Sequence, residues 1–315
     1  MLFTNAVLGL PVSHSLSPKI HSLAYDLLGL PFRYVAKEMT IDGFRDFVSK
    51  IIDEDYRGLS VTMPLKFLAA TCADRLSNLV RRCGAANTLV FESHSEERVG
   101  LTDQYLSRIS PDQKTFFGKS QLLDPNTQIP SDSEHMPDPR GLSSRILAAY
   151  NTDVYGIIRT IFHYGLDCSE VAILGCGATA ASVLLALEEL SCIGNTVIYA
   201  RNLSAAKSMQ KKLCLDLDIL PISTFKGNFS CVISTLPSDV VLPIPRSVRG
   251  TLFDVNYNPW PTGIARSWPT DRVVSGRLML VEQAIAQISL FCFTQLTQEM
   301  ECLLRDTLYA RIVTC

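Results

Sequence analysis

The sequence has no excess of basic residues and no paired cysteines, and each absence removes a class of function. Its 315 residues hold 29 Lys and Arg against 31 Asp and Glu, so no basic surface suited to a phosphate backbone is expected. The ten cysteines form no C-x-x-C pair and no zinc spacing, which favours reduced core residues over a disulfide framework. We therefore expect no metal site and no direct binding of nucleic acid.

Export and membrane signals are also missing. The opening segment "MLFTNAVLGL" lacks the basic stretch of a signal peptide. The most apolar stretch, 171–187, is interrupted by Gly175 and Gly177 and is short for a membrane span. We therefore expect no membrane helix and a cytoplasmic location.

What is present is the rhythm of an α/β protein. Over 5–90, short apolar runs such as "AVLGLPV" and "GLSVTM" alternate with helical runs, which predicts βα units. Over 93–149 that rhythm is lost, and five of the sixteen prolines fall there, which predicts an inserted, partly disordered loop. From 153 the rhythm returns and predicts a second α/β unit, and 279–315 closes the chain with helices.

The second unit contains a dinucleotide-binding pattern, "VAILGCGATAASVLLALEEL". An apolar strand leads into Gly175-x-Gly177 and then into a helix, and Ala180 stands at the third glycine position. Such a turn lets the backbone approach a pyrophosphate that faces the helix N-terminus. The alternative is an ordinary glycine-rich turn.

The following strand indicates which dinucleotide is bound. An NAD site usually has an acidic residue after this strand, but "NTVIYARNLSAAK" supplies Arg201 and no Asp or Glu. A guanidinium suits a 2′-phosphate, so NADP is favoured over NAD. The alternative is a surface arginine.

Polar residues also gather at the ends of the predicted elements of the first unit. Lys66 in "GLSVTMPLKFLAA" lies between a strand and a helix, and Ser15 and Ser17 in "GLPVSHSLSPKIH" precede a helix that Ser17 would cap with Pro18 at its first position. "GAANTLVF" places Asn87 before a strand, and "AYNTDVYGI" places Asp153 before a helix. Taken singly, each is more often a turn, a cap or a solvated side chain than a site.

Taken together, these motifs resemble the shikimate and quinate dehydrogenase family. The motifs "SHSLSP", "VTMPLK", "GAANT", "NTD", the glycine turn, "DVNYNP" and "MLVEQA" occur in the order found in that family. In particular, the chain resembles the shikimate dehydrogenase domain of fungal multifunctional shikimate-pathway proteins, and it also resembles the related quinate-pathway repressors.

The resemblance implies a domain plan. Residues 1–152, with the inserted loop 93–149, would form a substrate-binding α/β domain that helices 279–315 complete. Residues 153–278 would form a Rossmann-type NADP-binding domain, with a cleft between the two.

The resemblance also implies the roles of individual residues. Lys66 and Asp153 would be the catalytic pair, which we treat as one coupled acid/base unit that accepts the hydroxyl proton as hydride leaves. Ser15 and Ser17 would bind the carboxylate of the acid. The rest of the substrate pocket would be lined by Thr62, Asn87, Tyr257 and Gln283. The cofactor would contact Gly175, Gly177, Ala178, Arg201, Asn202 and Gly276.

Departures from the family pattern leave two functions open. Ser60 replaces a usual asparagine, one arginine remains for the 2′-phosphate, and Leu278 replaces a glycine, which predicts crowding of the nicotinamide. One function is an NADP-dependent dehydrogenase acting on shikimate or quinate. The other is a non-catalytic sensor that binds the same acids and acts in the nucleus through a protein partner. The resemblance also suggests that this chain can be fused to further domains.

Overall fold

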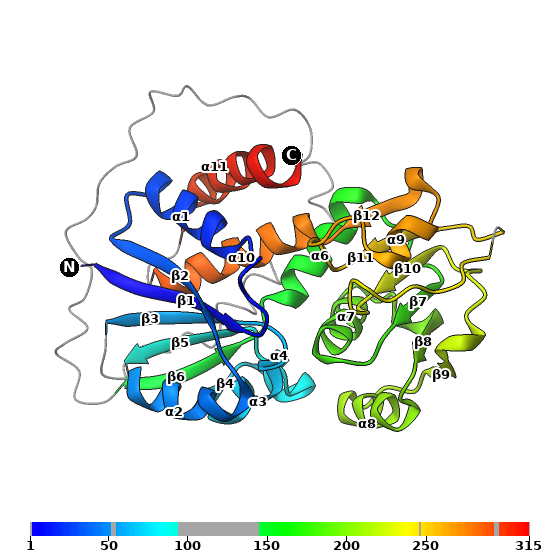
Figure 1. The fold of residues 1–315 in the computed structure, drawn as a ribbon, viewed down its shortest axis with the longest axis horizontal. Coiled ribbons are helices and arrows are strands. Elements are labelled where there is room, and N and C mark those ends of the chain that lie inside the picture. The colour runs from blue at the N-terminus through cyan, green and yellow to red at the C-terminus, as the bar shows by residue number, and fades with distance from the viewer. Residues whose placement is uncertain (1, 52–54, 94–144, 246, 293–295, 315) are drawn as a thin grey trace.

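Two six-stranded sheets organise the chain (Figure 1). The computed structural model describes residues 2–51, 55–93, 145–245, 247–292 and 296–314. Helices pack on both sheets, so the predicted α/β fold is confirmed. Among the described residues, no helix combines the length and apolar character that crossing a membrane requires.

The first sheet belongs to the N-terminal half and has the order β2-β1-β3-β5-β6-β4. Its strands are β1 (Phe3–Gly9), β2 (Phe32–Glu38), β3 (Tyr56–Val61), β4 (Arg75–Leu76), β5 (Thr88–Ser93) and β6 (Arg145–Tyr150). The sheet is mixed, since β5 runs antiparallel to both β3 and β6. One face is covered by α2 (Ile41–Ile51), α3 (Lys66–Cys72) and α4 (Asn78–Cys83), and the other by α1 (Ser17–Leu27), α10 (Arg277–Phe291) and α11 (Gln298–Leu308), which runs on into η7 (Tyr309–Val313).

The alternation of side chains along each strand explains why both faces of this sheet are buried. In β1, Ala6 and Leu8 join the core beneath α2 and α3, whereas Phe3 and Val7 join the core beneath α1 and α10. A strand that is apolar on both faces must be covered by helices on both sides.

The second sheet is parallel throughout and has the order β12-β11-β10-β7-β8-β9. Its strands are β7 (Val171–Leu174), β8 (Thr196–Ala200), β9 (Asp218–Pro221), β10 (Cys231–Ser234), β11 (Thr251–Asp254) and β12 (Val273–Ser275). The helices of this unit are α6 (Asp153–Tyr164), α7 (Ala178–Glu189), α8 (Leu203–Leu213) and α9 (Gly263–Ser267), with short turns η4 (Ile193–Asn195), η5 (Ile222–Thr224) and η6 (Thr270–Arg272). The strand order reverses between β7 and β10, which is where ligands bind in open α/β sheets.

Two helices join the halves of the molecule. Helix α6 follows β6 of the first sheet, yet Val154 and Ile157 pack into the core of the second. Helix α10 follows β12 of the second sheet, and Val281 and Ile285 pack into the core of the first. The two helices cross closely at Gly156, where an added Cβ would lie 2.6 Å from the carbonyl oxygen of Met279. The domain boundaries at 152/153 and 278/279 stay predictions.

The predicted loop 93–149 is wrong at its C-terminal end. Residues 145–150 form β6, which pairs with β5 along its whole length. Leu147 and Ala149 face one core of the sheet, and Ala148 and Tyr150 face the other, so the segment lacks the polar and apolar alternation that signals a strand. The remainder, 94–144, lies outside the described residues.

The start of α1 is also one residue earlier than predicted. Ser17 is the first helical residue and Leu16 occupies the N-cap position. The Ser15 hydroxyl accepts a hydrogen bond from the Ser17 amide at 3.2 Å, so the local capping that we assigned to Ser17 is supplied by Ser15.

Candidate active site

Lys66 lies where the first sheet meets the second half of the molecule. Strand β3 ends at Val61, and a short turn follows in which the Leu65 amide donates to the Thr62 carbonyl at 2.9 Å. Leu65 is fully buried and anchors this turn, so Lys66 begins α3, as the sequence predicts. Its side chain is 14 % exposed, and its Nζ donates to Asp153 Oδ2 at 2.5 Å.

Asp153 is held from three directions. It begins α6, where a carboxylate interacts favourably with the helix dipole, and only 3 % of the residue is exposed. Its Oδ2 accepts from Lys66, its Oδ1 accepts from Asn87 Nδ2 at 2.8 Å, and its backbone amide donates to Asn151 Oδ1 at 3.1 Å. The carboxylate is thus fixed, and Lys66 is the more exposed member of the pair.

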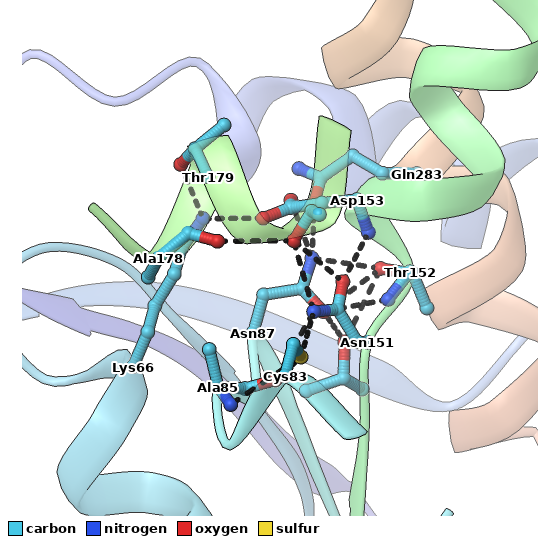
Figure 2. Close-up of polar contacts among 12 residues, drawn as sticks. Lys66, Cys83, Ala85, Asn87, Asn151, Thr152, Asp153, Ala178, Thr179 and Gln283 are labelled. Carbon is cyan, nitrogen blue, oxygen red and sulfur yellow. Dashed lines mark hydrogen bonds and ion pairs between the residues drawn. The ribbon is translucent and has the colours of Figure 1, made fainter. Parts of the chain in front are cut away.

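Asn87 connects this pair to α10 (Figure 2). Its Nδ2 donates to Gln283 Oε1 at 2.7 Å and to Thr152 Oγ1 at 2.9 Å, in addition to Asp153. Its Oδ1 accepts from the Thr152 amide at 2.8 Å. Four of the predicted site residues, Lys66, Asn87, Asp153 and Gln283, therefore form one hydrogen-bonded group.

Beneath this group lies a buried polar network that the sequence did not reveal. Gln287 Nε2 donates to Thr88 Oγ1 at 3.0 Å, while its Oε1 accepts from Ser60 Oγ at 2.8 Å. Ser60 in turn accepts from the Tyr34 hydroxyl at 2.6 Å. Gln287 lies four residues after Gln283 on the same helix face, which was the available signal.

His21 completes this network and is neutral in it. Its Nε2 lies 3.3 Å from Gln287 Oε1, its Nδ1 lies 3.1 Å from the Tyr25 hydroxyl, and its ring stacks on that of Tyr34. The tautomer with a proton on Nε2 satisfies both bonds, since Nε2 then donates and Nδ1 accepts. Burial lowers the pKa of His21 to about 3, against a smaller raising effect of the Gln287 hydrogen bond.

The predicted carboxylate-binding residues form a second group. Burial raises the pKa of Tyr257, and the hydrogen bond with Ser15 lowers it in part, so these two side chains are in contact. Asn258 Nδ2 donates to the His14 carbonyl at 3.0 Å, which ties the "DVNYNP" segment to the serine loop across the two halves. Ser17 is buried and hydrogen-bonds Tyr34, whose pKa is raised mainly by burial and lowered in part by its hydrogen bonds to Ser60 and Ser17.

The glycine turn has the form that a dinucleotide requires. Gly175 has a φ of +114°, and an added Cβ there would clash with the Thr235 side chain, so only glycine fits without strain. Gly177 is the N-cap of α7 and makes no side-chain capping bond, and an added Cβ would meet no atom within 4 Å. Without a side-chain cap, the first amide groups of α7 are suited to binding an anion, and open space adjoins Gly177.

Arg201 and Asn202 follow β8 at the same edge of the sheet. Burial raises the pKa of the Cys176 thiol in the glycine turn, and the positive charge of Arg201 lowers it in part, so the guanidinium lies near that turn. Asn202 accepts from the Ala205 amide at 3.0 Å and caps α8. Its role toward a cofactor stays a prediction, as does that of Ala178, the first residue of α7.

Gly276 and Leu278 lie where β12 leads into α10. An added Cβ at Gly276 would clash with the Val255 carbonyl, so close backbone packing explains why glycine stands here, and its role toward a cofactor stays a prediction. Leu278 is fully buried. Leu278 thus offers no exposed surface in this structure, and the crowding of a nicotinamide by its side chain stays a prediction. In the described residues, no cluster of three or more His, Cys, Asp or Glu could hold a metal ion.

Comparisons with known proteins agree with the geometry. Residues 7–89 match the family model of the shikimate dehydrogenase substrate binding domain. The chain is 28 % identical to the shikimate dehydrogenase (NADP(+)) of Methylobacillus flagellatus, over 89 % of this chain and 90 % of that protein. It is 27 % identical to the pentafunctional AROM polypeptide of Schizosaccharomyces japonicus, over 76 % of this chain but 13 % of that polypeptide.

A solved structure is also similar to this chain along nearly its whole length. The crystal structure of Mycobacterium tuberculosis shikimate dehydrogenase superposes with a TM-score of 0.66 and 25 % identity, covering 97 % of this chain and 99 % of that one. The similarity extends across both sheets and is not confined to the glycine turn.

Proposed function

We propose that this chain, which is similar to shikimate dehydrogenases along nearly its whole length, is an NADP-dependent dehydrogenase that interconverts 3-dehydroshikimate and shikimate. The observation that carries the proposal is the 2.5 Å contact between Lys66 and Asp153, formed where the two halves of the molecule meet. A mostly buried ammonium beside a fixed carboxylate is suited to moving a proton, and the neighbouring glycine turn is suited to holding a dinucleotide.

Each residue of the pair has a distinct task. Oxidation of the alcohol requires that the hydroxyl proton leave as the carbon loses hydride. Lys66 Nζ would accept that proton while one of its own N–H protons passes to the Asp153 carboxylate. The carboxylate keeps the lysine side chain oriented, because Asp153 is itself fixed by Asn87 and by the start of α6. In the reverse direction the same lysine would donate the proton to the carbonyl oxygen of the ketone.

The remaining polar groups would bind the acid. Asn87 and Gln283 project toward the pair and carry amide groups that can hydrogen-bond ring hydroxyls. Ser15, Ser17 and Tyr257 supply hydroxyl donors for the carboxylate, and Thr62 lies in the turn that precedes Lys66. We propose shikimate as the acid, and quinate is tested as the competing substrate.

The residues present fit NADP. The free amide groups of α7 would receive the pyrophosphate in front of Gly177, and Arg201 would receive the 2′-phosphate. When bound, NADP supplies the hydride acceptor. Within the described chain, no acidic residue follows β8 between Arg201 and Leu213, as a NAD site would require for the ribose hydroxyls.

The test is an assay of the purified protein. Reduction of NADP is followed by absorbance with shikimate or with quinate, and the melting temperature is measured with each acid alone. We expect turnover with shikimate and NADP, and a rise in melting temperature that the double variant Ser15→Ala and Ser17→Ala largely abolishes.

Two results would overturn the proposal. Stabilisation by an acid with no measurable binding of NADP or NAD at millimolar concentration would support the non-catalytic sensor, which requires a protein partner. Absence of stabilisation by either acid would exclude both functions.

A further inference from the structure

A threonine at the start of α7, just after the glycine turn, contacts the lysine of the other half of the molecule. Thr179 is the second residue of α7, and its Oγ1 accepts a hydrogen bond of 3.4 Å from Lys66 Nζ (Figure 2). Lys66 thus has one partner beside the first sheet, Asp153, and one on α7, the helix that follows the glycine turn. Neither the sequence pattern nor the resemblance pointed to Thr179.

The two contacts leave the ammonium with a defined orientation. A lysine ammonium has three N–H groups and no acceptor, and here one points to Asp153 and one to Thr179. The third is available to the substrate hydroxyl. Removing either partner would let the ammonium rotate about its last bond, so its orientation depends on both.

The Thr179 hydroxyl can also act as a donor. While it accepts from Lys66, its own proton is uncommitted, because among the described residues it makes no second hydrogen bond. It is partly exposed and lies beside the open space in front of Gly177. A hydroxyl here can reach an oxygen of a ligand on the α7 amides without releasing Lys66.

We propose that Thr179 is a positioning residue that links the dinucleotide to Lys66, accepting from the lysine ammonium and donating to an oxygen of the bound dinucleotide. This inference rests on the proposed function. It makes the dinucleotide turn part of the machinery that orients the proton-transferring lysine, and it predicts that the two side chains contribute jointly to dinucleotide affinity.

The experiment is a calorimetric titration of NADP, without the acid, into the wild type and four variants. Thr179→Val keeps the shape and removes the hydroxyl, Thr179→Ser keeps the hydroxyl, Lys66→Met removes the ammonium, and the fourth combines Thr179→Val with Lys66→Met. We expect NADP affinity to fall about five- to tenfold in Thr179→Val, as for the loss of one good hydrogen bond, and to stay within twofold in Thr179→Ser. The double variant should bind no more weakly than Thr179→Val alone, because without the Thr179 hydroxyl Lys66 has no link to the dinucleotide through this residue.

A matched control lies on the same helix. Ser182→Ala removes a hydroxyl that accepts from Asn151 Nδ2 at 3.0 Å, one turn further along α7, and it should lower the melting temperature without changing NADP affinity. The pH profile of turnover should shift in Thr179→Val and return in Thr179→Ser, which a packing role would not produce.

Three outcomes decide the matter. Unchanged NADP affinity in Thr179→Val, or losses that multiply in the double variant, would overturn the role of Thr179 while leaving the dehydrogenase intact. Failure of the wild type itself to bind NADP would overturn the proposed function and this inference with it. A joint, non-additive loss supports the inference.

Discussion

Replacement of Lys66 tests the catalytic pair by stability and by turnover at once. Lys66→Met keeps most of the aliphatic side chain and deletes the charge. The lysine and aspartate side chains are 14 % and 4 % exposed, so the small energies of surface ion pairs do not apply. Removing one partner of a buried pair costs about 3–5 kcal/mol. Since Asp153 keeps its bond from Asn87, we expect the lower end, about 3 kcal/mol.

The double variant of Lys66→Met with Asp153→Asn isolates the pairwise energy. Asp153→Asn leaves the lysine able to reach solvent, so it should cost less, about 1–2 kcal/mol. With both charges removed, no uncompensated charge remains, and the double variant should be more stable than the sum predicts by at least about 1.5 kcal/mol. Urea unfolding of the four proteins measures this coupling.

Turnover should respond differently from stability. Both single variants should lose more than about a hundredfold in rate, and the double variant should be little worse than either, because the pair acts as a unit. A Lys66→Met protein that keeps a tenth of the wild-type rate would refute the assignment. So would a stability coupling below about 0.5 kcal/mol, which would show that the short contact is not an energetic pair.

Three further predictions concern other parts of the molecule. Burial lowers the pKa of His21 from 6.5 to about 3, so between these pH values the unfolded chain binds more protons than the folded one. The free energy of unfolding should therefore fall as pH falls, by up to about 1.4 kcal/mol per pH unit. Urea unfolding at several pH values should show a shallower fall in His21→Asn, and an unchanged slope would contradict the buried neutral ring. Arg201→Ala should abolish the preference for NADP over NAD in calorimetric titrations, because the guanidinium is the group available to the 2′-phosphate; an undiminished preference would assign that phosphate to another residue. Leu278→Ala should cost about 2–5 kcal/mol in unfolding free energy by opening a cavity, without a matching gain in NADP affinity; tighter NADP binding would instead support the crowding hypothesis.

The sequence by itself determined the α/β class, the position of the glycine turn and the start of α3 at Lys66. These features are local. A run of apolar residues, a pair of glycines or a strand-to-helix junction is written in consecutive residues, and its backbone consequence follows from sterics and side-chain period. The strand β6 was missed for the complementary reason, since a strand buried on both faces by tertiary packing lacks the alternation that identifies strands locally.

Only the tertiary structure decided which polar residues meet. Lys66 and Asp153 are 87 positions apart, and their contact depends on α3 and α6 starting at the same edge of the first sheet. The burial of Leu278, the network through Gln287 and Ser60, and the bond from Lys66 to Thr179 likewise arise from the crossing of α6 and α10 and from the packing of α7. No period or motif encodes such contacts, because the distance between two side chains is fixed by every element that lies between them.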